Sequence, residues 1–163
     1  MVTELPVRIE FSLPDGWHAA PPDEVGAPGV AFVALRPTST GGGANGFTTN
    51  LTIAGEIRDP AVPMATIADE SVHRLETVAE AVRVRDRTDL GPSDAPGMTQ
   101  VLDIEMGQGK RLMQCQVYLP MDDVHDPSRR AVLELVLTCT PEQLDDALPD
   151  FQRFVGTVQP AGS

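Results

Sequence analysis

The sequence predicts one α+β domain, in which an antiparallel sheet of about six or seven strands packs against two main helices. Three observations support this fold class. Segments with alternating apolar and polar side chains recur along the chain, two other segments carry apolar residues every three or four positions, and 14 Gly and 15 Pro supply turns. Neither a repeat nor a linker interrupts the chain, so residues 1–163 are expected to form a single domain.

The first half of the chain contains three predicted strands. Residues 7–13 alternate apolar and polar side chains, as a half-buried strand does, and a Pro-Asp-Gly turn at 14–16 follows. Residues 30–35 are apolar on both faces, which is typical of a central strand covered on both sides. After a Gly-rich loop at 38–46, residues 47–57 form the third strand, with apolar side chains mainly on one side.

Two segments have the apolar periodicity of helices. In residues 64–82 apolar side chains recur every three or four positions, and Pro63 suits the start of this helix. Residues 140–143, Thr-Pro-Glu-Gln, form a capping box at the start of the second helix. Because Pro149 clashes with a carbonyl one turn earlier, we expect a break or kink near 147–149.

Between the two helices, four consecutive strands form a meander whose pairing can be derived. Gln108 and Gly109 fit a two-residue hairpin turn closed by Gly107 and Lys110. Pairing outward from this turn brings apolar residues together on one face: Ile104 opposite Met113, Leu102 opposite Cys115, and Met98 opposite Leu119. A shift by one residue would turn Asp103 toward the core, so this register is preferred.

The strand before this hairpin carries Arg83, Arg85 and Arg87 on one face. Antiparallel pairing sets Arg85 beside Asp103 and Arg83 beside Glu105, which predicts a cross-strand charge ladder. The alternative is a site for an anion or an acidic partner.

The last strand of the meander, residues 130–140, pairs with residues 110–120 so that Cys115 meets Cys139. The two cysteines are expected to be buried thiols that act as small apolar side chains, with a cross-strand disulfide as the alternative.

Charge and processing signals limit the classes of partner. The chain has 12 basic and 24 acidic residues, a net charge of −12, which argues against nucleic acid and anionic membranes as partners. The N-terminus has no basic region followed by an apolar run, and no stretch approaches the roughly 20 apolar residues of a membrane-spanning helix. We therefore expect a cytoplasmic protein with no membrane partner.

No catalytic, cofactor or metal site is predicted. Residues 122–126 gather three Asp side chains and His125, which could ligate a divalent cation, but the calcium-loop spacing is absent and a solvated turn is expected. The Gly-rich segment 41–46 leads into a strand instead of a helix, so a hairpin loop is favoured over a phosphate cradle. Neither a Gly-x-Ser-x-Gly motif nor another nucleophile–base pair is present, so no enzyme is expected.

Five short motifs occur in a recognisable order. Residues 13–17 read LPDGW, 49–53 read TNLTI, 68–76 read ADESVHRLE, 109–112 read GKRL and 140–142 read TPE. In this order they resemble the PsbP-like superfamily, and most of all its actinobacterial LpqN-type proteins. The likeness spans residues 5–158. It implies an α/β/α sandwich around an antiparallel sheet and a non-enzymatic role as an accessory subunit, a small-protein binder, a lipoprotein or a chaperone. LpqN-type lipoproteins carry a lipidated cysteine after a signal peptide; the sequence shows neither, so a soluble cytoplasmic relative is expected.

The resulting functional hypothesis is a non-enzymatic protein-binding module, an adaptor or chaperone-like accessory protein that acts on a protein partner or as a homodimer. It needs no cofactor. The proposed partner-binding surface is a sheet face that is neither fully apolar nor heavily charged, formed by Thr99, Val101, Gln116, Tyr118, Val136 and Thr138. The alternative hypothesis is a small-molecule or lipid carrier with a pocket between the sheet and the loop at Trp17.

Overall fold

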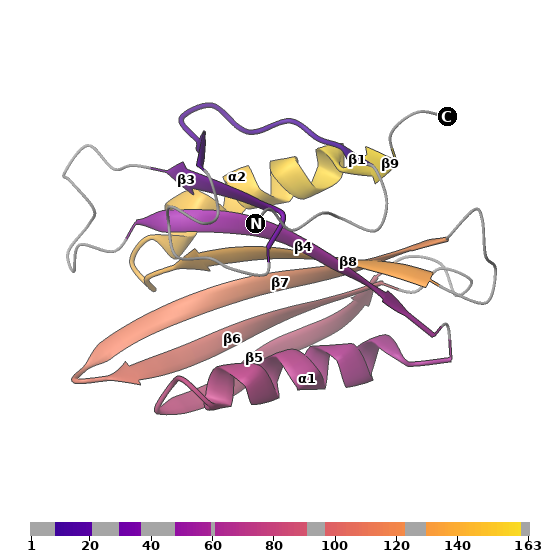
Figure 1. The fold of residues 1–163 in the computed structure, drawn as a ribbon. Coiled ribbons are helices and arrows are strands. Elements are labelled where there is room, and N and C mark those ends of the chain that lie inside the picture. Colours follow the sequence, from indigo (N-terminus) through magenta and orange to yellow (C-terminus); the bar gives the residue numbers. More distant parts are fainter. Residues whose placement is uncertain are drawn as a thin grey trace.

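The computed structural model describes residues 9–20, 30–36, 48–59, 61–90, 97–122 and 130–160. Their main feature is a seven-stranded antiparallel sheet in the order β2-β3-β4-β8-β7-β6-β5 (Figure 1). Its strands are β2 (His18–Ala20), β3 (Phe32–Arg36), β4 (Thr49–Arg58), β5 (Ala81–Leu90), β6 (Gly97–Gly107), β7 (Lys110–Asp122) and β8 (Arg130–Cys139). A separate small sheet pairs β1 (Ile9–Glu10) with β9 (Gln159–Pro160).

Two helices cover opposite faces of the large sheet, which gives the expected α/β/α sandwich (Figure 1). Helix α1 (Met64–Glu76) lies against β5 and β6, and α2 (Leu144–Thr157) lies against β8. Directly paired residues of antiparallel strands project to the same face. The register therefore assigns every strand residue to the α1 face or to the α2 face.

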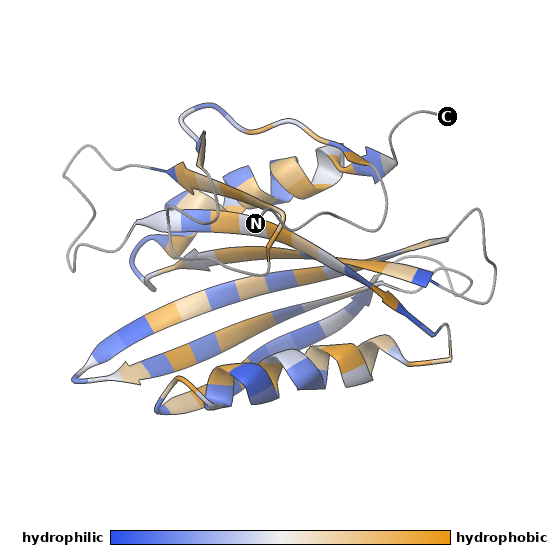
Figure 2. Cartoon of the chain, in the orientation of Figure 1, coloured by the Kyte–Doolittle hydropathy of each residue, from blue (hydrophilic) through white to orange (hydrophobic). Residues whose placement is uncertain are grey.

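Each face has its own apolar core. On the α2 face, Leu51, Leu135 and Leu137 are fully buried together with Phe151 and Phe154 of the helix. On the α1 face, a smaller cluster joins three helix residues to three strand residues: Met64, Ile67, Ala68, Met98, Tyr118 and Val132. Figure 2 shows polar and apolar residues alternating along β7, and the register places Cys115 and Val117 on the α2 face and Gln116 on the α1 face.

Several predicted elements are confirmed with small changes of boundary. The expected strands at 30–35 and 47–57 correspond to β3 and β4, and the four-strand meander is β5 to β8. The hairpin turn closes through Gly107 and Lys110, and the positive φ angles of 55° at Gln108 and 76° at Gly109 suit a two-residue turn that follows the strand twist. The sequence did not indicate β2.

Helix α2 runs without interruption through Pro149, so the expected break near 147–149 is wrong. The carbonyl that loses its partner belongs to Asp145, an exposed residue, where water can satisfy it. The capping box is confirmed: the Thr140 amide donates to Gln143 Oε1 at 2.9 Å, and the Gln143 amide donates to Thr140 Oγ1 at 3.3 Å.

Helix α1 is shorter than the apolar pattern over 64–82 predicts, because it ends at Glu76. The Thr77 amide and hydroxyl both donate to the Arg74 carbonyl, at 3.3 Å and 2.6 Å, which tightens and closes the last turn. Val78, which was assigned to the apolar stripe, is 70% exposed, and β5 begins at Ala81.

The predicted strand over 7–13 is confirmed only at β1. Phe11 and Leu13 lie outside any strand but pack against the α2-face core. Phe11 makes edge contacts with Phe32 and Phe154, with ring centroids 4.9 Å and 5.4 Å apart. The alternation here therefore reflects packing of an extended segment between β3 and α2.

The derived register of β6 against β7 is wrong by one residue, because a bulge at Met106 follows the hairpin turn. Met113 faces Asp103 instead of Ile104, and Cys115 faces Val101 instead of Leu102. Asp103 therefore lies on the α2 face with only 8% of its surface exposed. The observed register is therefore the one that was expected to be disfavoured because it buries Asp103.

Three guanidinium groups surround Asp103 and make its burial tolerable. They belong to Arg83, Arg85 and Arg111, at 3.6, 3.7 and 3.9 Å from the carboxylate. The predicted charge ladder exists, but a second bulge at Arg85 changes its pairs: Arg83 faces Asp103, and Arg87 turns to the α1 face. The three arginines of β5 thus do not share one face.

The pairing of β7 with β8 differs from the prediction by two residues, which keeps every side chain on its expected face. Cys115 faces Leu137, and Cys139 faces Met113. Both cysteines are free and buried. Burial raises the thiol pKa to about 11 at Cys115 and to about 12 at Cys139, where the neighbouring Cys115 adds to the effect. The Gly-rich segment 41–46 and residues 123–126 of the acidic turn lie outside the described residues.

Candidate functional site

The six residues of the proposed partner-binding face are divided between the two faces of the sheet. Thr99 and Val101 face Val117 and Cys115 on the α2 face. The other four, Gln116, Tyr118, Val136 and Thr138, lie on the α1 face. The bulge at Met106 causes this division, because it reverses the alternation of β6 relative to β7.

Of the four residues on the α1 face, three have side chains beneath the surface. Tyr118 is fully buried, Gln116 is 2% exposed and Val136 is 8% exposed. Thr138 is half-buried. These side chains therefore form the floor of a site, and residues from other parts of the fold form its walls.

Beneath α1, a chain of hydrogen bonds connects four strands of the sheet, from β5 to β8. Arg87 donates to Gln100 Oε1 at 2.8 Å, and Gln100 Nε2 donates to Gln116 Oε1 at 2.6 Å. Gln116 Nε2 then donates to Gln114 Oε1 at 2.8 Å, and Gln114 Nε2 donates to Thr138 Oγ1 at 3.2 Å. The buried amides thereby satisfy one another, as buried polar groups must.

The chain of hydrogen bonds also holds the helix in place. Gln100 Nε2 donates to the Ala68 carbonyl of α1 at 3.2 Å, and Arg87 Nη1 donates to Asp69 Oδ1 at 2.9 Å. Arg58 at the end of β4 also binds Glu70 of α1 through two hydrogen bonds of 2.7 and 2.8 Å. Helix α1 is thus positioned by polar contacts as well as by its apolar stripe.

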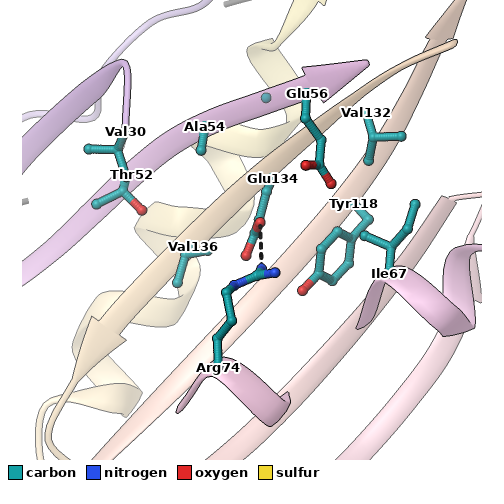
Figure 3. A pocket seen from close by; sticks show the side chains of 11 residues that line it. Val30, Thr52, Ala54, Glu56, Ile67, Arg74, Tyr118, Val132, Glu134 and Val136 are labelled. Atoms are coloured by element: carbon teal, nitrogen blue, oxygen red, sulfur yellow. Dashed lines mark ion pairs between the residues drawn. The ribbon is translucent and has the colours of Figure 1, made fainter. Parts of the chain in front are cut away.

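Because α1 lies against β5 and β6, it leaves the α1 face of β4 and β8 beside it without a covering helix among the described residues. Two adjacent hollows occupy this position, with volumes of about 410 and 270 Å³. Both are lined by Thr52, Arg74, Glu134 and Val136, so they form one continuous groove. We call it the α1 groove (Figure 3).

The walls of the larger hollow are mainly aliphatic. Its apolar lining consists of Val30, Ala54, Ile67, Val132 and Val136. The Tyr118 ring lies at the base of this hollow, beside Ile67 (Figure 3).

Two carboxylates of the sheet line the groove, Glu56 of β4 and Glu134 of β8, and the one that lines both hollows is Glu134. Its side chain is 23% exposed, with Arg74 Nη2 3.8 Å from one carboxylate oxygen and the Ser71 hydroxyl donating to the other at 3.5 Å (Figure 3). Burial raises the pKa of Glu134, against the lowering effects of Arg74, Ser71 and Tyr118.

Tyr118 completes the polar end of the groove. Its hydroxyl donates to Gln116 Oε1 at 2.7 Å. Burial and the charge of Glu134 raise the pKa of Tyr118, so the hydroxyl stays protonated at neutral pH. The groove thus offers both hydrogen-bond donors and acceptors, with the Ser71 hydroxyl directed at the Glu134 carboxylate.

The sequence alone did not single out any of the three charged residues of the groove, which are Glu56, Arg74 and Glu134. Glu134 is the one charged residue in the run AVLELVL at 131–137, a signal that could have identified it. Arg74 lies on the polar side of α1 among other charges, where the sequence does not distinguish it. Within the described ranges, no group of three or more His, Cys, Asp or Glu side chains could hold a metal ion, and no helix is long and apolar enough to cross a membrane.

The architecture matches solved structures at low sequence identity. LpqN of Mycobacterium tuberculosis, described as involved in cell envelope biogenesis, superposes with a TM-score of 0.66 at 11% identity over 93% of this chain and 83% of LpqN. Cyanobacterial PsbP from Synechocystis gives a TM-score of 0.60 at 12% identity over 93% of this chain and 86% of its own. The chain has a PsbP-like fold. This confirms the fold expected from the short motifs.

A third protein shares the PsbP-like fold less closely. A Pseudomonas aeruginosa protein of unknown function, described as a putative regulator, superposes with a TM-score of 0.51 at 17% identity over 99% of this chain and 87% of its own. None of the three neighbours is described as an enzyme. No family model and no curated protein matches the sequence.

Proposed function

We propose that this PsbP-like chain is a non-enzymatic protein-binding module whose docking site is the α1 groove. The observation that carries the proposal is the groove itself, an open channel beside α1 with aliphatic walls and a polar floor. Protein-binding surfaces that are not permanently covered have this mixture of apolar and polar area. The buried floor is also rigid, because its hydrogen bonds are internally satisfied.

A small-molecule carrier is the second candidate, favoured by the volume of about 410 Å³, which lies in the range of ligand pockets. The hollow does not lie where a carrier pocket was expected, between the sheet and the loop at Trp17. Trp17 is 5% exposed and belongs to the α2-face core, and its indole Nε1 donates to Asp150 Oδ2 at 3.0 Å. Neither hollow of the groove is lined by Trp17. A carried ligand would occupy the α1 groove instead.

Site-specific photocrosslinking would test the protein-binding proposal. A photoreactive side chain is placed at Thr52 or Thr138 in the groove, and at the exposed Gln152 of α2 as a matched control. We expect one and the same protein, identified by mass spectrometry, to crosslink from both groove positions and not from Gln152. Equal crosslinking from all three positions would contradict the proposal. Native mass spectrometry separates the candidates further, because a copurified small molecule displaced by Thr52→Trp would favour the carrier.

A further inference from the structure

We propose that the α1 groove recognises a lysine side chain of the protein partner, with the ammonium group bound at Glu134. This inference rests on the proposed function and specifies the chemistry of its site. It starts from the position of the Glu134 carboxylate, which lines both hollows of the groove.

The carboxylate of Glu134 retains capacity to bind a donor. A carboxylate can accept about four hydrogen bonds, and good charge-assisted ones measure about 2.7–2.9 Å. The contacts of Glu134 with Ser71 and Arg74 are longer, at 3.5 and 3.8 Å. Arg58, in contrast, binds Glu70 nearby at 2.7 and 2.8 Å, so close pairing is attainable in this part of the molecule.

The charge in the groove favours a cation. Its lining contains two carboxylates, Glu56 and Glu134, and one guanidinium, Arg74. Arg58 pairs with Glu56 as well as with Glu70, so these five side chains together carry one net negative charge. The net charge of −12 for the whole chain adds long-range attraction for a basic partner.

The walls favour a cation on an aliphatic stem. Ala54, Ile67 and Val136 give apolar contact above the carboxylate (Figure 3), and lysine buries its methylene groups against such surfaces while its head remains polar. The compact ammonium has three donors, which suit the Glu134 carboxylate and the Tyr118 hydroxyl oxygen. A planar guanidinium pairs best with both oxygens of a carboxylate, and one oxygen of Glu134 already accepts from the Ser71 hydroxyl.

Arg74 acts as a competing cation in this arrangement. It contacts Glu134 from the rim, and its side chain is 61% exposed, so it can move into solvent when the ammonium enters. Removal of Arg74 should therefore strengthen lysine binding. Removal of the Glu134 charge should weaken it.

The test uses the full chain and three capped pentapeptides, titrated by nuclear magnetic resonance. Their central residue is lysine, norleucine or arginine between alanines. We expect the lysine peptide to shift the amide signals of Thr52 and Val136, and norleucine to bind at least about tenfold more weakly. Glu134→Gln should weaken lysine binding by about tenfold or more, whereas Arg74→Ala should strengthen it several-fold. Glu76→Gln, at an exposed position of α1 outside the groove lining, serves as the control and should change it little.

Three results would overturn the inference. The lysine and norleucine peptides could bind equally, the arginine peptide could bind as tightly as the lysine peptide or more tightly, or the Arg74→Ala variant could bind the lysine peptide more weakly than the native chain does. Free n-butylamine that binds as tightly as the lysine peptide would point to a carrier of small amines and reject a protein source. The failure of this inference is separable from that of the proposed function. A protein partner could crosslink in the groove and bind Glu134→Gln as tightly as the native chain. That result would support the protein-binding proposal and reject only the recognition of lysine.

Discussion

Gln100 of β6 and Gln116 of β7 face each other beneath α1, with the Nε2 of Gln100 2.6 Å from the Oε1 of Gln116. Both side chains are almost completely buried. This pair is the centre of the hydrogen-bond chain from Arg87 to Thr138, in which each donor points toward β8. It connects the helix that forms one wall of the α1 groove to the strands that form its floor.

Removing one amide of this pair should destabilise the fold. Gln100→Leu conserves volume but removes the hydrogen bonds of Gln100 with the Ala68 carbonyl, Arg87 and Gln116, at a cost of about 2–3 kcal/mol in the free energy of unfolding. Urea unfolding followed by the fluorescence of Trp17, the single tryptophan, measures this. The same change at the exposed Gln152 should alter stability by less than about 0.5 kcal/mol. Equal midpoints for the two variants would show that the pair contributes nothing.

The burial of Glu134 should make stability depend on pH. Because burial raises its pKa in the folded state, the native protein holds this proton more tightly than the unfolded chain. The free energy of unfolding therefore falls as the pH rises from the ordinary glutamate pKa to the raised pKa of the folded state. Above the raised pKa, the buried charge of Glu134 continues to lower the free energy of unfolding. Glu134→Gln removes this cost.

Thermal unfolding across pH would measure that effect. We expect Glu134→Gln to be more stable than the native chain at neutral pH, and the difference to disappear on acidification to below the ordinary glutamate pKa. Glu76→Gln, at an exposed position of α1, is the control and should not show this pattern. A lower melting temperature for Glu134→Gln at neutral pH would mean that attraction by Arg74 outweighs burial.

The two thiols should be unreactive in the folded protein. Burial raises their pKa to about 11 at Cys115 and about 12 at Cys139, so little thiolate forms at pH 8 and the reagent has no access. Iodoacetamide at pH 8 should modify neither cysteine in buffer and both in urea, as counted by intact mass. Rapid modification of one cysteine in buffer would place that thiol at the surface.

The contact between Trp17 and Asp150 should stabilise the packing of the N-terminal segment on α2. Trp17→Phe removes the 3.0 Å hydrogen bond and part of a buried ring, and should cost about 1–3 kcal/mol, measured by circular dichroism in urea. In an Asp150→Ala background the same change should cost less, by about 0.5 kcal/mol or more. Arg153→Ala should cost at most about 1 kcal/mol, since Arg153 is 74% exposed and 3.7 Å from Asp150. Strict additivity of the two changes would show that the hydrogen bond is without effect.

Local sequence patterns predicted most elements because they depend on neighbouring residues. The two-residue turn at Gln108 and Gly109 and the capping box at Thr140 need only a few adjacent side chains, and both are confirmed. The pairing beyond the turn could not be obtained in this way. A bulge at Met106 shifts it by one residue, and its position depends on what α1 and α2 can bury.

The candidate site was harder to predict than the fold. Thr99 and Val101 were assigned to the partner-binding face from the derived register, and the shift moved them to the α2 face. Gln116 and Tyr118 were assigned from the sequence to an accessible sheet face, whereas both side chains are buried. Their burial follows from the position of α1, which no pairing rule between strands contains.

By itself the sequence determined the fold class, the order of the strands in the meander and the burial of both cysteines, because alternation and turn chemistry are local properties. Only the tertiary structure decided which face Asp103 and Arg87 occupy and which charged side chain enters the groove. Single-residue bulges reverse the alternation at little local cost, and they are selected by distant partners: three arginines around Asp103, and Gln100 with Asp69 around Arg87. Burial of Glu134 likewise requires Ser71 and Arg74, which α1 brings from a distant part of the chain.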